Sequence, residues 1–416
     1  MRFALLLLAA GLAQAAPASS ASNFYLKDGD RVVFYGDSIT YHLYYAAFVE
    51  AYVATRFPRL HVRFVSSGVG GDKVSGGPEA GDIDLRLRRD VVAYRPTVVT
   101  IMLAGNDAGG VAWNEALFKK FSTGYEHILD NLKQSLPGAR ITLIQHVGWD
   151  DVTRPPLFEG GYNAVIIRYN RFVKELGERR GLTVVDFNGP EQELLRKAKA
   201  ADPAMASRIV ADRGHPGPGA HLLMAKSLLK AWNGPATVAA VEIDAGVGRV
   251  VRADNAEVSD LRVGSGVTWT ETDGSLAMQI PEFDDASAYA IRNSGFVEEL
   301  DQEPLKVTNL AAGRYSLAID GETVGDFTKE QLRAGINLAK FPTPMSKQAL
   351  DVYDLTMRHK DVHSNRWRMI QIPLADYDSP HVREAIDALD RLEDEIIEQE
   401  RARAQPKPRH FALAPE

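Results

Sequence analysis

Short apolar runs alternate with longer segments of helical period from Arg31 to about Trp232. The apolar runs predict strands, which cover residues 31–35, 62–66, 97–103, 140–146 and 182–186. The segments of helical period predict helices over residues 43–56, 85–93, 115–136, 162–180 and 219–231. Strands that are apolar almost throughout, with helices between them, are typical of a parallel sheet covered on both faces. We therefore expect a doubly wound, three-layer α/β domain at residues 24–235, with its ligand beyond the carboxyl ends of the strands.

The pattern changes after Pro235 to short alternating runs, which predict a small antiparallel β domain over residues 236–327. Its strands are expected at residues 238–243, 248–252, 258–263, 267–271, 276–280, 305–309 and 315–319. A further strand at 323–327 follows across Asp320-Gly321, where both positions tolerate the positive φ of a tight hairpin. Residues 328–416 are expected to form a helical and irregular extension. It contains one charged helix over 380–403, whose carboxylates are interpreted as a solvated face.

Composition and charge narrow the class of protein. The chain has 416 residues, of which 45% are hydrophobic and 25% charged, enough for a substantial core and more than one domain. The formal net charge is -7 and no block of Lys and Arg stands out, so we expect no nucleic-acid partner. The chain has no cysteine, which excludes disulfides, a thiolate nucleophile and cysteine-based metal sites.

The first residues have the pattern of a secretory signal peptide. A basic start at Arg2 precedes an apolar run from Phe3 to Leu12 and the small-residue site Ala13-Gln14-Ala15, which predicts a signal peptide over residues 1–15. The alternative is a membrane anchor, but the run falls short of the ~20 residues that span a bilayer. We expect an exported protein, periplasmic or extracellular and of bacterial type, with no integral membrane segment after cleavage.

The stretch VFYGDSIT places Gly36-Asp37-Ser38 directly after the first predicted strand. Ser38 is either a nucleophile held at the end of the strand or an ordinary turn serine. The second interpretation is common, since glycine permits unusual backbone angles and Asp and Ser bond to nearby backbone groups. Serine is a weak nucleophile without a base, so the first interpretation requires a histidine, an orienting carboxylate and donors for an oxyanion.

Candidate donors follow the second and third predicted strands. The glycine block Gly70-Gly71 is either a flexible loop or a source of backbone N–H groups for a substrate oxygen. Asn106 either caps the next helix or offers its side-chain amide to a developing negative charge. Both positions lie at the edge of the sheet where a ligand is expected.

The candidate base is His215, which lies between Gly214 and Pro216 just before the last predicted helix of the domain. Because proline opposes a helical conformation in the residue before it, His215 is displayed on a loop. Asp212 can accept a hydrogen bond from one ring nitrogen while the other nitrogen faces the serine. The alternative is a helix-capping aspartate beside a surface histidine.

Taken in order, these four segments resemble the blocks of the SGNH hydrolase superfamily, also called GDSL esterases and lipases. The resemblance covers residues 30–232 and implies the flavodoxin-like three-layer fold of that family. It implies that Ser38 is the nucleophile, that His215 is the general base and then acid, and that Asp212 is its partner. It also implies an oxyanion hole made by the backbone N–H groups of Ser38 and Gly71 and the side chain of Asn106. Such an enzyme needs no cofactor and no metal, and we expect neither.

Other polar residues are weaker candidates. His146, Asp37 and Asp107 follow predicted strands, so they are candidates for lining the substrate site; for His146 a satisfied polar residue in a loop is the alternative. His359 and His363 have the spacing of a zinc pair on a helix, but no Glu follows His359. A surface pair is therefore expected there.

The leading hypothesis is an exported serine esterase that acts through an acyl-enzyme on a small-molecule or glycan ester. A carbohydrate O-acetyl esterase is favoured, because the appended β domain suits a polymer and the chain lacks a long apolar, lid-like stretch. A lipid-directed esterase or lysophospholipase is the alternative. A hypothesis of another class is a secreted glycan-binding protein whose hydrolase fold is vestigial.

Overall fold

The computed structural model describes residues 23–281 and 283–416. The predicted signal peptide at residues 1–15 lies outside the described residues. Within the described ranges, no helix combines the length and the apolar character needed to cross a membrane.

The N-terminal half is built on a five-stranded parallel sheet with the order β2-β1-β5-β6-β7. Counted along the chain, these strands have the order 2-1-3-4-5, which is that of flavodoxin-like folds. The predicted α/β fold class is confirmed. The strands are β1 (Arg31–Gly36), β2 (Arg63–Gly68), β5 (Val98–Met102), β6 (Arg140–Gln145) and β7 (Thr183–Asp186), each within two residues of its predicted bounds.

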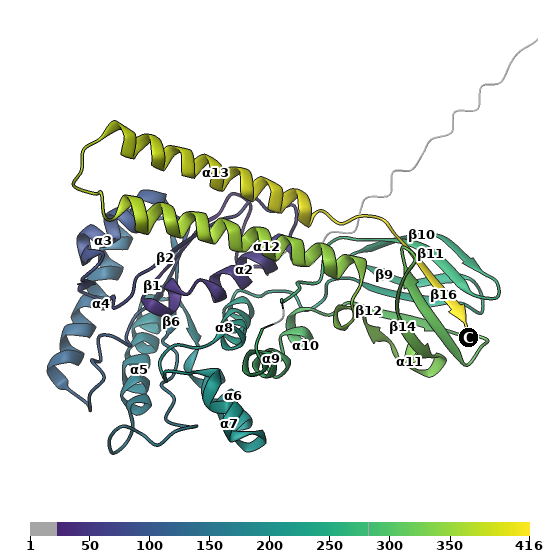
Figure 1. Ribbon diagram of the computed structural model, residues 1–416, viewed down its shortest axis with the longest axis horizontal. Coiled ribbons are helices and arrows are strands. Elements are labelled where there is room, and N and C mark those ends of the chain that lie inside the picture. Colours follow the sequence, from purple (N-terminus) through teal and green to yellow (C-terminus); the bar gives the residue numbers. More distant parts are fainter. Residues whose placement is uncertain (1–22, 282) are drawn as a thin grey trace, which may run out of the picture.

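Alternation of side chains along the buried strands fills a core on each face of this sheet. Val32 and Phe34 belong to one core, and their neighbours Val33 and Tyr35 belong to the other. Helices α2 (Tyr44–Arg56) and α8 (Pro218–Ala231) cover the first face, and α3 (Ile83–Asp90), α4 (Glu115–Ser135) and α5 (Tyr162–Arg180) cover the second. The result is a helix–sheet–helix sandwich (Figure 1).

Several short elements in this half escaped prediction. Helices α6 (Asn188–Ala201) and α7 (Pro203–Ile209) pack with α8 and α9 (Asp285–Arg292) around Leu194, Leu195 and Ala198. The remaining pieces are α1 (Ser38–Tyr41), β3 (Gly76–Gly77), β4 (Gly81–Asp82) and a 3₁₀ turn at Val92–Tyr94. Helices α9 and α10 (Phe296–Leu300) come later in the chain, within residues 236–327, where only strands are predicted.

The C-terminal part is mainly β, as predicted, and consists of two sheets around one core. An antiparallel sheet has the order β10-β11-β16-β13-β14, and a mixed sheet has the order β15-β12-β8-β9. Trp269 and Phe411 of the first sheet share a core with Ile243 and Leu305 of the second. The bounds are β8 (Ala240–Asp244), β9 (Arg249–Asp254), β10 (Ala256–Val263), β11 (Val267–Asp273), β12 (Pro304–Thr308), β13 (Arg314–Ile319), β14 (Glu322–Thr328), β15 (Ile336–Asn337) and β16 (Arg409–Pro415).

Three predictions for this part need correction. Residues 276–280 form no strand, although all five are described. Strand β8 pairs in parallel with β12, so the β part is not purely antiparallel. The prediction of a helical and irregular tail is wrong for residues 409–415, because β16 pairs with both β11 and β13 in the middle of the sheet. The predicted hairpin at Asp320-Gly321 is confirmed, with φ of 51° and 82°.

A long helical hairpin connects the β part to the α/β domain (Figure 1). After α11 (Lys329–Ala334) and a 3₁₀ turn at Leu338–Lys340, helix α12 (Pro344–Asn365) runs along α2 and is followed by a π-helical turn at Arg366–Gln371. Helix α13 (Pro380–Ala404) packs along α12 and returns the chain to β16.

The prediction of a surface pair at His359 and His363 is wrong, because α13 covers that face of α12. The two residues are only 1% and 3% exposed. His359 Nδ1 lies 2.7 Å from Glu50 Oε1, and His363 Nδ1 lies 3.2 Å from both oxygens of Glu393. Burial would lower the pKa of His359, but the Glu50 and Glu393 carboxylates raise it to about 9. Glu393 and Glu400 are buried, so the face of α13 that carries them is not solvated.

Candidate active site

The residues singled out in the sequence gather at the carboxyl edge of the sheet. Ser38 follows β1 and is the first residue of α1, Gly71 lies in the loop after β2, and Asn106 follows β5. The strand order reverses between β1 and β5, and ligands of doubly wound sheets bind at such a point. His215 reaches the same edge from the loop before α8.

Ser38, His215 and Asp212 form a hydrogen-bonded chain. Ser38 Oγ lies 2.8 Å from His215 Nε2, and His215 Nδ1 lies 2.6 Å from Asp212 Oδ2. A carboxylate only accepts hydrogen bonds, so Nδ1 carries the proton and Nε2 of the neutral ring is free to accept the hydroxyl proton of Ser38. This arrangement can increase the nucleophilicity of the serine.

The loop that carries His215 is held by Asp212 itself. Asp212 Oδ1 accepts the backbone N–H groups of Gly214 and His215 at 3.0 and 2.8 Å, while Arg213 between them has a φ of 75°. The residue that caps α8 is Gly217, so the capping interpretation of Asp212 does not hold. Partial burial would raise the pKa of Asp212, but the hydrogen bonds from the ring and backbone of His215 lower it.

The candidate oxyanion donors are fixed by a buried ion pair behind them. Gly71 has a φ of 74°, which a residue with a side chain rarely adopts, and the next residue is the buried Asp72. Asp72 accepts a hydrogen bond from Arg86 Nε at 3.0 Å, and its backbone oxygen accepts one from Asn106 Nδ2 at 3.0 Å. The second hydrogen of the Asn106 amide remains for a ligand. Asn114 caps α4, so Asn106 is not the helix cap.

Asp37 and His146 form a second aspartate–histidine pair beside Ser38. Asp37 Oδ1 accepts the N–H of Ile39 and caps α1, while Asp37 Oδ2 lies 2.9 Å from His146 Nε2. His146 Nδ1 lies 3.2 Å from the carbonyl oxygen of Val147. Burial would lower the pKa of His146, but the Asp37 carboxylate raises it above its ordinary value. Because both ring nitrogens face acceptors, these contacts favour the protonated ring.

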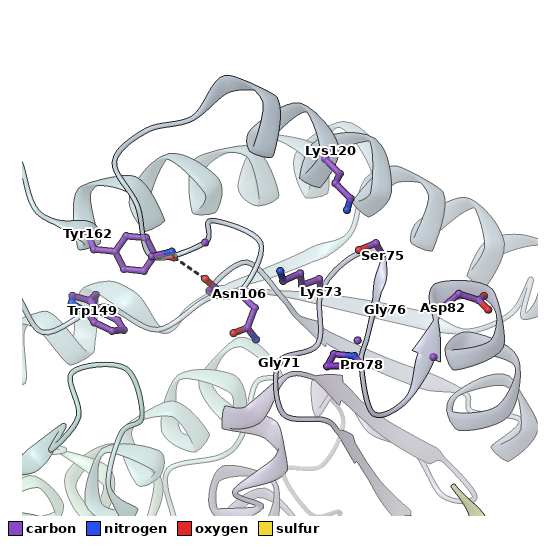
Figure 2. A pocket seen from close by; sticks show the side chains of 15 residues that line it. Gly71, Lys73, Ser75, Gly76, Pro78, Asp82, Asn106, Lys120, Trp149 and Tyr162 are labelled. Carbon is purple, nitrogen blue, oxygen red and sulfur yellow. Dashed lines mark hydrogen bonds between the residues drawn. The ribbon is translucent and has the colours of Figure 1, made fainter. Parts of the chain in front are cut away.

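Two cavities meet at this edge. A small one of about 80 Å³ is lined by Ser38, His215, Asp37, His146, Val147 and Ile166, among others. A larger one of about 810 Å³ begins at Gly71 and Asn106 and extends between the glycine loops to α4 (Figure 2). Gly105, Asn106, Trp149 and Tyr162 line both cavities.

Comparison with known proteins gives the family of this domain. Residues 34–223 match the sequence model of the GDSL-like Lipase/Acylhydrolase family. This part of the chain is a GDSL-like lipase/acylhydrolase domain. The GDSL-like domain is therefore that of an acyl ester hydrolase, which confirms the family that the sequence motifs indicated.

Two relatives illustrate how the GDSL-like domain is used. An acetylxylan esterase of Geobacillus stearothermophilus is 26% identical over 223 residues, which are 49% of this chain and 93% of the relative. A solved structure, BT4096, described as a gut microbial diltiazem-metabolizing enzyme, is 25% identical and superposes with a TM-score of 0.83. That match covers 94% of this chain and 98% of the other, so the β part and the helical hairpin have counterparts in it.

The three residues predicted to line the substrate site, Asp37, Asp107 and His146, do not all lie at the cavities. Asp107 is buried, accepts the N–H of Val74 at 3.1 Å and is not among the residues that line these two cavities, so a place at the substrate stays a prediction for it. Burial raises its pKa to about 7. Asp37 and His146 do line the small cavity.

Several residues that line the larger cavity were not predicted from the sequence, above all Lys73, Lys120 and Tyr162. Lys73 follows the glycine block by only two residues, which is a signal that could have been used. Lys120 gave none, because its position depends on how α4 packs against the loops. Among the described residues, no group of three or more His, Cys, Asp or Glu side chains is placed to hold a metal ion.

Proposed function

We propose that this protein is an exported serine esterase that removes short acyl groups, acetyl above all, from carbohydrate. The single observation that carries the proposal is the hydrogen-bonded chain from Ser38 Oγ through His215 to Asp212, at 2.8 and 2.6 Å. Catalysis is assigned to residues 24–235. The localisation rests on the signal-peptide pattern of residues 1–15 alone.

The proposed reaction has two steps, acylation of Ser38 and hydrolysis of the acyl-enzyme, and each passes through a tetrahedral intermediate. Ser38 Oγ attacks the ester carbonyl as its proton passes to His215 Nε2, and the carbonyl oxygen becomes an oxyanion facing Ser38 N–H, Gly71 N–H and the Asn106 amide. The C–O bond to the alcohol then breaks, and His215 gives its proton to the leaving oxygen. Water enters, loses a proton to His215 and attacks the acyl carbon. Collapse of this second intermediate releases the carboxylic acid and returns the proton to Ser38.

The size of the small cavity supports a short acyl group. Its volume of about 80 Å³ is far below the roughly 300–1,000 Å³ of pockets that hold drug-sized ligands. Ile39, Val147 and Ile166 line the cavity with apolar surface that suits a methyl group, and its volume is too small for a long chain. A lipid substrate is disfavoured for this reason.

A carbohydrate alcohol is supported by the larger cavity and by one relative. Trp149 and Tyr162, with ring centroids 5.2 Å apart, lie at the junction of the two cavities and offer aromatic surface to a sugar ring. The relative from Geobacillus stearothermophilus is named as an acetylxylan esterase.

The test is hydrolysis of p-nitrophenyl esters from acetate to palmitate by the mature chain and by Ser38→Ala. We expect serine-dependent turnover of acetate that falls steeply beyond the first few carbons. Rising rates toward palmitate would favour a lipid substrate. Tight glycan binding without any serine-dependent turnover would favour a binding protein with a vestigial fold.

Export is tested separately in a bacterial host. The full chain is expected to give esterase activity in the periplasm or the medium. Deletion of residues 2–15 should keep that activity inside the cell, and equal export of both forms would contradict the assignment.

A further inference from the structure

The large cavity carries two lysines whose charge the proposed reaction does not use. Lys73 and Lys120 both line it, and each is exposed. Figure 2 shows the Lys120 side chain pointing from α4 toward the loop of Lys73 and Ser75, while Lys73 points toward Asn106. The charge of Lys73 acts on the buried Asp107 beneath the loop and lowers the pKa of that carboxyl, although burial raises it more.

The backbone segments that carry the two lysines are fixed by hydrogen bonds and by packing. The segment around Lys73 is fixed because Val74 N–H donates to Asp107 Oδ1 at 3.1 Å and Gly76 N–H donates to the Lys73 carbonyl at 2.9 Å. Helix α4 touches this same loop: a Cβ on Gly124 would lie 2.5 Å from Val74 Cγ2. Lys120 lies one helical turn before Gly124, so it is set above the loop that carries Lys73.

The local charge has the opposite sign to that of the whole chain. The formal net charge is -7, yet the titratable residues that line the large cavity are two lysines, one tyrosine and one aspartate. That aspartate, Asp82, uses Oδ1 to cap α3 by accepting the N–H groups of Asp84 and Leu85. At the far end of the cavity, Tyr162 is neutral at physiological pH, and burial raises its pKa further above the ordinary value of 10. Two like charges facing one cavity repel each other unless an anion lies between them.

We propose that the large cavity binds an anionic alcohol component, so that the preferred substrate is an acyl ester of a sugar chain bearing carboxylates. This rests on the proposed function, in which the small cavity takes the acyl group and the large one takes the alcohol. The sugar chain extends from Trp149 and Tyr162 past Asn106, and its carboxylates lie against Lys73 and Lys120. The lysines are specificity residues that contact the alcohol component and not the reacting carbonyl, so they act on KM rather than on kcat.

The test compares two substrates that differ only in charge. Acetylated oligogalacturonate is one, and the same oligomer with its carboxyl groups converted to carboxamides is the other. Acetate release is followed for the parent chain, for Lys73→Gln/Lys120→Gln, and for Lys119→Gln, which removes a neighbouring exposed lysine that does not line the cavity.

We expect the parent to favour the charged oligomer about tenfold in kcat/KM, through KM, and to lose this preference in high salt. The double variant should lose the preference while keeping its rate on the carboxamide, and Lys119→Gln should behave as the parent. Equal rates on both oligomers in the parent, turnover of neither, or a preference that survives in the double variant would overturn the inference. Serine-dependent hydrolysis of p-nitrophenyl acetate separates these results from failure of the proposed function, in which that ester would also go unhydrolysed.

Discussion

Two aspartate–histidine pairs lie beside Ser38, and they are built for different tasks. Asp212 and His215 come from one exposed loop, with side chains 59% and 38% exposed. Asp37 and His146 come from the ends of two strands and are 1% and 7% exposed. The contact distances, 2.6 and 2.9 Å, are similar, so distance alone does not distinguish the pairs.

The difference lies in what the second ring nitrogen meets. In His215 it faces the Ser38 hydroxyl, which can give up a proton; in His146 it faces the carbonyl oxygen of Val147, which cannot. His146 is further enclosed by Asn170, which bonds to both its backbone N–H and its carbonyl. A histidine that carries a proton in catalysis therefore needs a partner with which it can exchange that proton. The His146 ring lies between two fixed acceptors, which suits a structural role.

The largest expected effect separates the two histidines. His215→Gln should lower kcat on p-nitrophenyl acetate by about 10⁴- to 10⁶-fold and leave the free energy of unfolding nearly unchanged. His146→Gln should cost about 3–5 kcal/mol of stability, because it leaves Asp37 buried without its cation, and should lower the rate far less. Rates and urea unfolding are measured on the same samples. An His146→Gln variant that is fully stable but as inactive as His215→Gln would make His146 the base.

Substitution of the two aspartates should distinguish the pairs in the same way, with smaller losses of rate than substitution of His215. Asp212→Asn is expected to lower kcat by about 10²- to 10⁴-fold, because the amide no longer fixes the tautomer of His215. Asp37→Asn retains an oxygen that can accept the Ile39 N–H, so it should keep the start of α1 and lose no more than about tenfold in rate. Steady-state kinetics decide between them, and a loss of only a few-fold in Asp212→Asn would move the orienting role to another residue.

The residues around Ser38 and His215 could be predicted from the sequence, because local sequence patterns place each of them at the end of a strand or before a helix. The Ser38, Gly71, Asn106 and His215 motifs follow buried apolar strands or precede a helix, so pattern alone brings them to one sheet edge. The ion pair of Asp37 with His146 could not be predicted, because it joins the ends of β1 and β6, and these strands are not neighbours in the sheet. The same holds for β16 at residues 409–415. Its partners in the sheet lie more than a hundred residues away in β11 and more than ninety residues away in β13.

A smaller effect follows from the raised pKa of His146. A histidine whose pKa is higher in the folded chain than its unfolded value of 6.5 contributes stability that is fully present below pH 6.5. That contribution is lost as the pH rises through the folded pKa. We expect this pair to make the free energy of unfolding fall as the pH rises above 6.5.

The pKa of His359 is raised to about 9 in the folded chain, so His359 also loses stabilising free energy as the pH rises. The contribution of the Asp37–His146 pair is therefore obtained by comparing the parent with His146→Gln. The slope with pH should be shallower in His146→Gln than in the parent. Parallel slopes in the parent and His146→Gln would mean that the buried ring is neutral when folded.

Further effects of modest size should come from two glycines, each of which packs against an aromatic ring of the site. A Cβ on Gly105 would lie 2.6 Å from His146 Cε1, and a Cβ on Gly214 would lie 2.8 Å from Trp149 Cζ3. Neither glycine has a positive φ, so alanine tests the contact alone. The His146 ring is bonded through both nitrogens and cannot move, whereas the half-buried Trp149 and the His215 loop can. We therefore expect Gly105→Ala to cost about 1–3 kcal/mol of stability, and Gly214→Ala to cost little stability but a few-fold in rate. If Gly214→Ala instead unfolds the chain while Gly105→Ala is tolerated, the rigid pair is the one on the loop.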